Sequence, residues 1–257
     1  NLSTKKLLGG QLQTTQTGIT TKFTGDLVGT INAGDKLAFI HPALSNSGTE
    51  QSYAGVSTDL INLTNQDGSS LQFIAVAETT AKTAGSVSDL SLNFSHVTSY
   101  VTLNMANLTP SKSITEVNVS NVGTSCVMKI TSEGELSWTS TTGTVTLTPS
   151  ANNTNSRGTA VARFSMYESA SAARKVKVTI DEAKKIATYT DAAFGKNTHY
   201  NTIVADFQAI PDPSVPIDYP EYGESIPVLG DYDNNPSTPE TYLHWAPVNC
   251  GYENTGD

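Results

Sequence analysis

The sequence predicts an all-β protein with two β-sandwich domains in tandem. Thr, Ser, Asn and Gly are abundant, only 15% of the residues are charged, and no long stretch carries Ala, Leu, Glu and Lys at helical spacing. This composition favours strands and turns over helices. Short apolar runs recur roughly every eight to twelve residues with turn residues between them, which is typical of β-sandwiches. The 257 residues are enough to bury a core in each of two domains.

Residues 90–105 carry the clearest strand pattern and a change in its phase. The apolar residues first fall on even-numbered positions, at Leu90, Leu92 and Phe94. They then fall on odd-numbered positions, at Val97, Val101, Leu103 and Met105. Since a one-residue shift turns every side chain to the opposite face, the step at Ser95 and His96 marks a bulge, a sheet crossing or a passage between domains. We interpret it as the domain junction. His96 has no Cys, Asp or Glu at ligand spacing and is interpreted as a packing residue.

Residues 1–91 are expected to form the first domain. Residues 1–18 are polar and are expected to be a weakly anchored leading segment or an edge strand. Strand-like runs follow at residues 19–23, 27–31, 36–41, 60–64 and 71–77. Gly-Asp and Asp-Gly pairs between these runs supply the turn conformations that short antiparallel strands need. The sequence Asn65-Gln66-Asp67-Gly68 is the strongest hairpin signal in this half.

Residues 92–208 are expected to form the second domain. After the alternating stretch, further strand-like runs lie at residues 114–119, 126–130, 144–148, 160–166, 175–180, 186–189 and 200–207. The run at 175–180 is the clearest two-sided strand, because Val176, Val178 and Ile180 alternate with polar residues. The connection that follows it, at residues 181–185, is expected to be a loop rather than a helical turn.

Residues 209–257 form an acidic, Pro-rich extension, which we expect to pack on the second domain. Eight of the eleven prolines lie here, and the nine acidic residues are accompanied by no Lys or Arg, so they account for the whole net charge of −9. A neutral body with an acidic extension argues against nucleic acid and anionic lipid as partners. The aromatic residues of the extension either pack on the second domain or form a platform for stacking sugars: Tyr219, Tyr222, Tyr242 and Trp245.

The sequence carries no signature of an enzyme, and no cofactor is expected. It contains no nucleophile elbow, His-Glu-x-x-His motif, phosphate-binding glycine loop or dinucleotide fingerprint. Asp231-Tyr-Asp233-Asn-Asn235 resembles the start of a calcium loop, but Pro236 stands where such a loop needs glycine. We therefore expect a solvated turn there and no metal site. No run of eighteen apolar residues is present, so no transmembrane segment is expected.

Two cysteines, Cys126 and Cys250, are too few for a structural zinc site. They would either form one disulfide between the body and the end of the extension, which requires an oxidising compartment, or remain two buried thiols. The sequence leaves both alternatives open.

Several segments resemble the fimbrillins and fimbrillin-like surface proteins of Bacteroidales, the subunits of type V pili. The resemblance spans residues 19–208 and rests on the order and spacing of its motifs. These are a short strand ending Asn65-Gln66-Asp67-Gly68, the run 73–77, Leu92-Asn93-Phe94-Ser95-His96 before an alternating strand, Ile114 to Val119 with the Gly123 turn, and Gly195-Lys196-Asn197-Thr198-His199-Tyr200 before a late strand.

The resemblance implies two transthyretin-like, Greek-key β-sandwich domains with a boundary near residue 92. It also implies export through the periplasm as a lipoprotein, anchoring in the outer membrane before assembly, and a final place on the cell surface. Loss of an N-terminal strand to a protease would let a neighbouring subunit donate a strand into the vacated groove. The expected partners are other pilus subunits and a ligand on a host or bacterial surface.

The sequence departs from the family at the expected maturation site. Cleavage in the family is attributed to a site after Arg, but the first Arg here is Arg157. Near the start only Lys5, Lys6 and Lys22 are available, so another protease acts, the strand is not released, or the subunit ends a fibre. The alternative function is an extracellular glycan-binding module, motivated by the aromatic residues of the extension.

Overall fold

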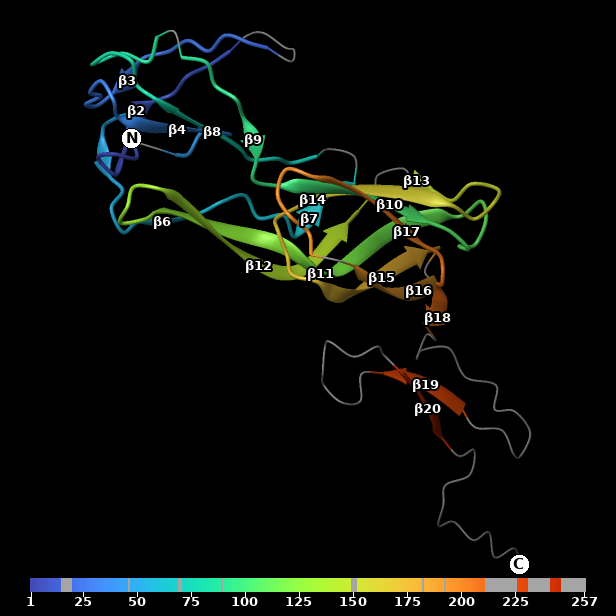
Figure 1. The fold of residues 1–257 in the computed structure, drawn as a ribbon. Helices are drawn as coiled ribbons and strands as arrows, with labels where there is room; N and C mark the ends of the chain where they lie inside the picture. The colour runs from blue at the N-terminus through green and yellow to red at the C-terminus, as the bar shows by residue number, and fades with distance from the viewer. Residues whose placement is uncertain are drawn as a thin grey trace, which may run out of the picture.

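The computed structural model describes residues 1–14, 20–45, 47–68, 71–88, 90–148, 152–181, 183–191, 193–210, 226–230 and 241–245. Within these ranges every regular element is a strand, so the predicted all-β class is confirmed (Figure 1). The first nine strands precede the alternating stretch or lie at its start: β1 Lys6–Leu7, β2 Gly9–Gly10, β3 Leu27–Val28, β4 Lys36–His41, β5 Gln51–Ser52, β6 Ser57–Asp59, β7 Asn65–Gln66, β8 Ala75–Thr80 and β9 Ser95–His96.

The remaining strands are longer on average and form most of the body. They are β10 Ser99–Met105, β11 Ser113–Ile130, β12 Leu136–Leu147, β13 Asn152–Asn153, β14 Ala160–Met166, β15 Ala172–Ile180, β16 Ala183–Asp191, β17 His199–Val204, β18 Gln208–Ile210, β19 Ile226–Gly230 and β20 Thr241–Trp245. Strands β4 and β14 have the bounds that the sequence predicts. The first is a continuous apolar run, Leu37 to Ile40, between polar residues, and the second alternates over most of its length.

The body is a sandwich of two sheets. One has the order β18-β16-β15-β11-β12-β7, with β13 and β6 also paired to β11, and the other has the order β14-β10-β17. Apolar residues from both sheets share one buried core, including Val101, Val117, Phe164 and Val176, each fully buried. In β10 the alternation predicted from the sequence is observed, because Val101, Leu103 and Met105 are buried while Tyr100 is exposed.

The N-terminal end of the molecule is built from much smaller sheets. These are the pairs β1–β5 and β2–β3 and the three-stranded sheet β4-β8-β9. Among the described residues, one small core at this end contains Ile31, Leu37 and Ala81 as buried residues, with four partly buried apolar residues against them. Leu2, and Ala75 and Ala77 of β8, are buried as well. Since few large side chains are buried there, hydrophobic burial stabilises this end less than it stabilises the body.

One long hairpin connects the two ends. Strands β11 and β12 pair antiparallel from Val117–Leu147 at one end to Ile130–Leu136 at the other, and the far half of β11 also pairs with β6 (Figure 1). Strand β7 pairs parallel with the other half of β12. Two strands from the first 91 residues thus lie in the large sheet, and the predicted division at residues 91 and 92 stays a prediction.

Two segments differ from the sequence expectation for identifiable reasons. The runs 114–119 and 126–130 belong to the single strand β11, because register shifts after Val119 and Gly123 carry the strand through a polar, Gly-containing stretch that resembles a turn. Residues 60–64 form no strand, although Leu63 is buried, because they bond irregularly to the carbonyls of Cys126 and Thr124. Asn65 and Gln66 form β7, not a hairpin with their neighbours.

The described part of the extension consists of the end of β18, which pairs with β16, and one antiparallel hairpin. The strands of this hairpin, β19 and β20, pair from Ile226–Trp245 to Gly230–Thr241. The predicted packing of the extension on the second domain falls on residues outside the described ranges.

Candidate functional site

An apolar groove follows the outer edge of β4 and is the main candidate site at the N-terminal end. Five consecutive residues of β4, Leu37 to His41, line a cavity of about 160 Å³. Neighbouring side chains of a strand point to opposite faces, so a cavity that touches all five lies against the strand edge rather than against one face. A larger hollow of about 540 Å³ shares Leu7, Ile40 and Leu44 with it and continues the groove.

The backbone of β4 is open along this edge. Leu2 N–H donates to Lys36 O at 2.8 Å and Lys36 N–H donates to Ser3 Oγ at 2.9 Å, so Lys36 directs both backbone groups outward. In an antiparallel ladder every second residue directs its backbone groups to the same side. Ala38 and Ile40 therefore also direct their N–H and C=O groups toward the outer edge. Beyond Lys36 no described strand pairs with this edge, because β4 is the end strand of its sheet. An unpaired edge of this kind can pair with an added strand.

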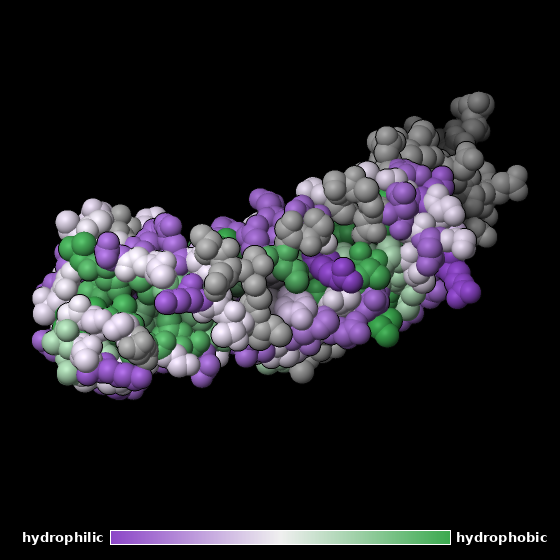
Figure 2. Space-filling view, turned by 90° about the horizontal axis from the view of Figure 1, so that it is seen from above, coloured by the Kyte–Doolittle hydropathy of each residue, from purple (hydrophilic) through white to green (hydrophobic). Residues whose placement is uncertain are grey.

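The opposite wall of the groove comes mostly from the leading segment. Leu7, Leu8 and Leu12 are half-buried and line the cavity across from β4. Phe23 and Phe94 close one end, with ring centroids 5.9 Å apart. Figure 2 shows apolar atoms gathered on this end of the molecule and ringed by polar ones. These residues give the groove apolar walls on both sides.

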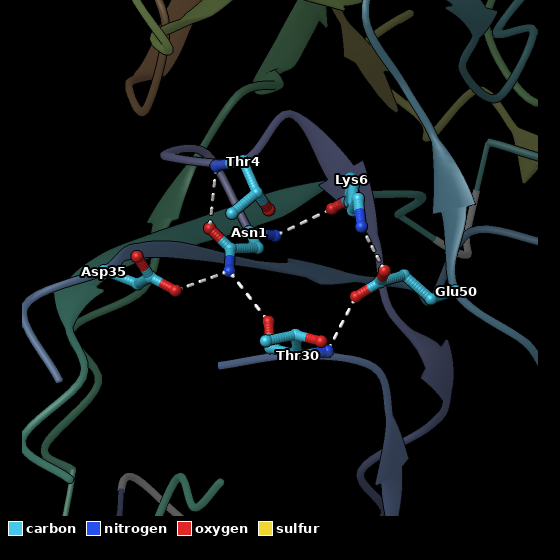
Figure 3. Close-up of polar contacts among 6 residues, drawn as sticks. All are labelled: Asn1, Thr4, Lys6, Thr30, Asp35 and Glu50. Atoms are coloured by element: carbon cyan, nitrogen blue, oxygen red, sulfur yellow. Dashed lines mark hydrogen bonds and ion pairs between the residues drawn. The ribbon is translucent and has the colours of Figure 1, made fainter. Parts of the chain in front are cut away.

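A polar cluster fixes the first residues beside the groove (Figure 3). Asn1 Nδ2 donates to Asp35 Oδ2 at 2.9 Å and to Thr30 O at 3.2 Å, and Asn1 Oδ1 accepts from Thr4 N–H. Glu50 receives Lys6 Nζ at 2.5 Å and Thr30 N–H at 2.7 Å. These donors lower the pKa of the Glu50 carboxyl, and the N–H of Asn32 with the Asn1 amide lowers that of Asp35.

The three lysines considered for cleavage lie in different settings. Lys5 accepts the N–H of Tyr53 at its carbonyl, and Lys6 lies in β1 and pairs with Ser52. Lys22 is exposed in residues 20–23, which belong to no strand. Since it is exposed and lies outside any described strand, Lys22 is the most accessible of the three to a protease. A cut after Lys22 would separate Leu7, Leu8 and Leu12 from the rest of the chain.

No protein-family model and no curated protein matches this sequence. Solved structures do match its fold. The chain is similar to a candidate cell adhesion protein from Bacteroides uniformis, with a TM-score of 0.50 and 13% identity over 77% of this chain and 81% of that one. Candidate cell adhesion proteins from Bacteroides ovatus and Bacteroides fragilis are 12% and 10% identical, with TM-scores of 0.44 and 0.41 over 76% and 96% of this chain and 71% and 80% of theirs.

The predicted junction lies between two sheets. His96 ends β9, which pairs with β8, and Ser99 begins β10, which belongs to the sandwich. Both Ser95 and His96 are exposed, and the His96 ring contacts the edge of Phe73 with centroids 5.1 Å apart. Their role as a domain junction stays a prediction.

Only one of the two cysteines of the predicted disulfide lies in the described residues. Cys126 is 3% exposed and is bonded to no cysteine among the described residues, whereas Cys250 lies outside them, so the disulfide stays a prediction. Burial raises the pKa of the Cys126 thiol to about 11. The raised pKa has the same cause as that of its neighbour Tyr167, whose hydroxyl donates to Ile61 O at 2.8 Å.

We expect the thiol of Cys126 to resist alkylation in the folded protein. At pH 8 a thiol with a pKa near 11 is ionised to about one part in a thousand, and the thiolate is the nucleophile. Iodoacetamide labelling followed by mass spectrometry should show negligible reaction at pH 8 and a rise of about tenfold per pH unit above it. In urea the site should react quickly if it is free, and only after reduction if it is bonded to Cys250. Fast labelling of the folded chain at pH 8 would contradict the raised pKa.

The other predicted site residues are outside what can be described. Tyr219 and Tyr222 lie in undescribed residues, and Tyr242 and Trp245 are placed only as backbone positions of β20. In the described ranges no three His, Cys, Asp or Glu residues are grouped to hold a metal ion. Nor does that part of the chain contain a helix long and apolar enough to cross a bilayer.

Sequence reasoning missed the groove beside β4. A signal for it was present, because residues 37–40 are apolar at both parities, which marks a strand with apolar surroundings on both faces. What the sequence did not indicate is which edge of that strand stays unpaired.

Proposed function

We propose that this chain is a non-enzymatic, fimbrillin-like subunit of a surface fibre that accepts a strand from a neighbouring subunit along the outer edge of β4. The observation that carries the proposal is the coincidence of an unpaired strand edge with an apolar groove whose far wall is the leading segment. Such an edge offers backbone hydrogen bonds, and such a groove offers burial for alternate side chains, which together are what strand addition requires.

The energetics of strand addition favour a durable joint. A donated strand along residues 37–41 would bury two or three large side chains, each contributing about 1.5–3 kcal/mol, in addition to its backbone hydrogen bonds. The leading segment provides the same kind of contacts through Leu7, Leu8 and Leu12, so it would have to leave first. Cleavage after Lys22 supplies that step, because the released piece then competes with a donor as a separate, dilutable chain.

The hairpin β19–β20 is the donor that we propose. Its backbone register pairs Ile226 with Trp245 and Val228 with Leu243, so apolar residues of the sequence stand opposite one another along the hairpin. An adhesive role on the cell surface is supported by the fold shared with the candidate cell adhesion protein from Bacteroides uniformis. Export as a lipoprotein and anchoring in the outer membrane belong to the same proposal.

Limited digestion with a lysyl endoprotease is expected to convert the monomer into stable multimers. Of the three lysines near the start, Lys22 should be the one cut, since it is exposed and lies outside any described strand whereas Lys6 lies in β1 and Lys5 is only partly exposed. Intact-mass spectrometry should show loss of residues 1–22, and an unboiled denaturing gel should show a ladder. Lys22→Gln should remove both the cut and the ladder, while Lys196→Gln, at another exposed lysine, should leave both unchanged.

A second variant separates cleavage from assembly. Val228→Asp with Leu243→Asp should leave the cut after Lys22 intact and abolish the ladder, because charged residues cannot fill an apolar groove. A chain that loses residues 1–22 completely and stays monomeric at high concentration would refute strand acceptance at this groove.

A further inference from the structure

A second hollow lies beside the predicted junction, away from the groove at β4. It has a volume of about 460 Å³, within the range of about 300–1,000 Å³ typical of small-ligand sites. Residues 71–73, β9 with the start of β10, and residues 197–199 form its walls. Three segments far apart in the sequence therefore meet at one cleft.

Aromatic rings dominate the exposed part of this cleft. Phe73 is 43% exposed and Tyr100 is 39% exposed, and neither contributes to a buried core. Phe73 lies between two imidazoles, with its centroid 5.5 Å from His41 and 5.1 Å from His96. Tyr100 stacks on His199 at 4.2 Å with an interplanar angle of 17°. The rings thus form two aromatic surfaces in the cleft, one around Phe73 and one on the paired strands β10 and β17.

Some polar groups of the cleft have no protein partner among the described residues. None of the described lining residues is Asp, Glu, Lys or Arg. Asn197 Oδ1 accepts the N–H of His96 at 3.1 Å, which leaves its Nδ2 without a protein partner among the described residues. The Gln72 side chain also has no described protein partner, and it can both donate and accept.

Hydrogen bonds hold these groups in place. Ser99 Oγ donates to Gly195 O at 2.7 Å and accepts Thr198 N–H at 2.9 Å, which fixes the loop that carries Asn197 to β10. The ring of His199 is held by a 2.9 Å hydrogen bond between Nε2 and Thr102 Oγ1. A ligand would therefore meet a preformed surface and would not have to order it.

We propose that this cleft binds a neutral saccharide. A pyranose ring has an apolar C–H face that suits an exposed aromatic ring, and hydroxyl groups at its edge that suit amides such as those of Gln72 and Asn197. The lack of cationic residues in the lining argues against ligands bearing phosphate or sulfate, which need Lys or Arg. The site does not depend on the aromatic residues of the extension or on strand donation.

A panel of neutral and anionic saccharides tests the proposal on the intact chain. Lactose, maltotriose and chitobiose serve as neutral probes and a heparin tetrasaccharide as the anionic one, with calorimetry and the imidazole NMR signals of His96 and His199 as readouts. At least one neutral probe should bind with a Kd of about 1 mM or lower and shift these signals. Heparin should not bind here. Failure of all three neutral probes, or displacement of a neutral probe by heparin, would overturn the proposal.

Substitutions locate the binding in the cleft. Phe73→Ala and Tyr100→Ala should each weaken binding about five- to tenfold, the range expected for one aromatic contact. Because both side chains are exposed, the variants should keep the fold, which thermal unfolding checks. Ile203→Ala is the matched control, since Ile203 is 74% exposed on the same three-stranded sheet and outside the lining. Equal affinity in both cleft variants and the wild type would assign the saccharide to another site.

Discussion

Replacing Arg174 with alanine is expected to lower the free energy of unfolding by roughly 3–5 kcal/mol, the largest effect of any single change discussed here. The Arg174 side chain is fully buried in β15 and donates to the carbonyls of Ala172 and Ala170 and to Ser169 Oγ, at 3.0–3.2 Å. Its guanidinium also lies 4.0 Å from the centroid of Phe194. Alanine would remove the donor from two carbonyls and from the buried Ser169, and it would leave a cavity against an aromatic ring.

Urea unfolding followed by circular dichroism measures this change. Arg174→Lys should recover only part of the loss, because an ammonium group cannot reproduce the planar fork that reaches several acceptors. Arg163→Ala is the control, since Arg163 is exposed on β14, and its effect should stay within about 0.5 kcal/mol. Equal stability of the Arg174→Ala and Arg163→Ala variants would show that the buried guanidinium is energetically neutral.

Replacing Gln66 with alanine is expected to cost roughly 2–4 kcal/mol. The Gln66 side chain is 5% exposed and makes two hydrogen bonds with the backbone of Ser165, as a neighbouring strand would. Its Nε2 donates to Ser165 O, and its Oε1 accepts Ser165 N–H, both at 2.8 Å. Because β7 belongs to the large sheet and β14 to the small one, this amide joins the two sheets at their edge. Alanine would leave both backbone groups of Ser165 buried and unpaired.

Thermal and urea unfolding of two further variants tests the role of the amide. Gln208→Ala, at an exposed residue of β18, should change stability by less than about 0.5 kcal/mol. Gln66→Glu should be strongly destabilised at pH 7 and should recover as the pH falls. Burial beside a carbonyl raises the pKa of such a carboxyl, and only its protonated form can donate to Ser165 O. A Gln66→Glu variant with the same stability at pH 7 and pH 5 would contradict this account.

Much of the fold could be predicted because burial on one face leaves a regular trace in the sequence. The alternation in residues 99–105 and 160–166 predicted β10 and β14 closely, and the change of phase at Ser95 and His96 corresponds to the point where the chain leaves one sheet for another. These features depend on local sequence alone, which is why one sequence suffices to find them.

Other features could not be predicted because they depend on distant partners. The far half of β12, at residues 136–143, has few buried side chains, so it lacks the alternation that identifies a strand. The groove beside β4 and the cleft at Phe73 and Tyr100 exist only where separate segments meet. Phe73 and Tyr100 looked like ordinary strand aromatics in the sequence, and their exposure is a property of the assembled surface.

The β11–β12 hairpin has a mechanical consequence. It runs from the sandwich core to the N-terminal end, where β6 pairs with the far half of β11 (Figure 1). Hydrogen bonds in an antiparallel pair lie across the strand direction. A pull that draws the two ends of the molecule apart along β11 therefore loads these bonds in shear, so that many must break together instead of opening one after another. The arrangement suits a protein that is loaded along β11.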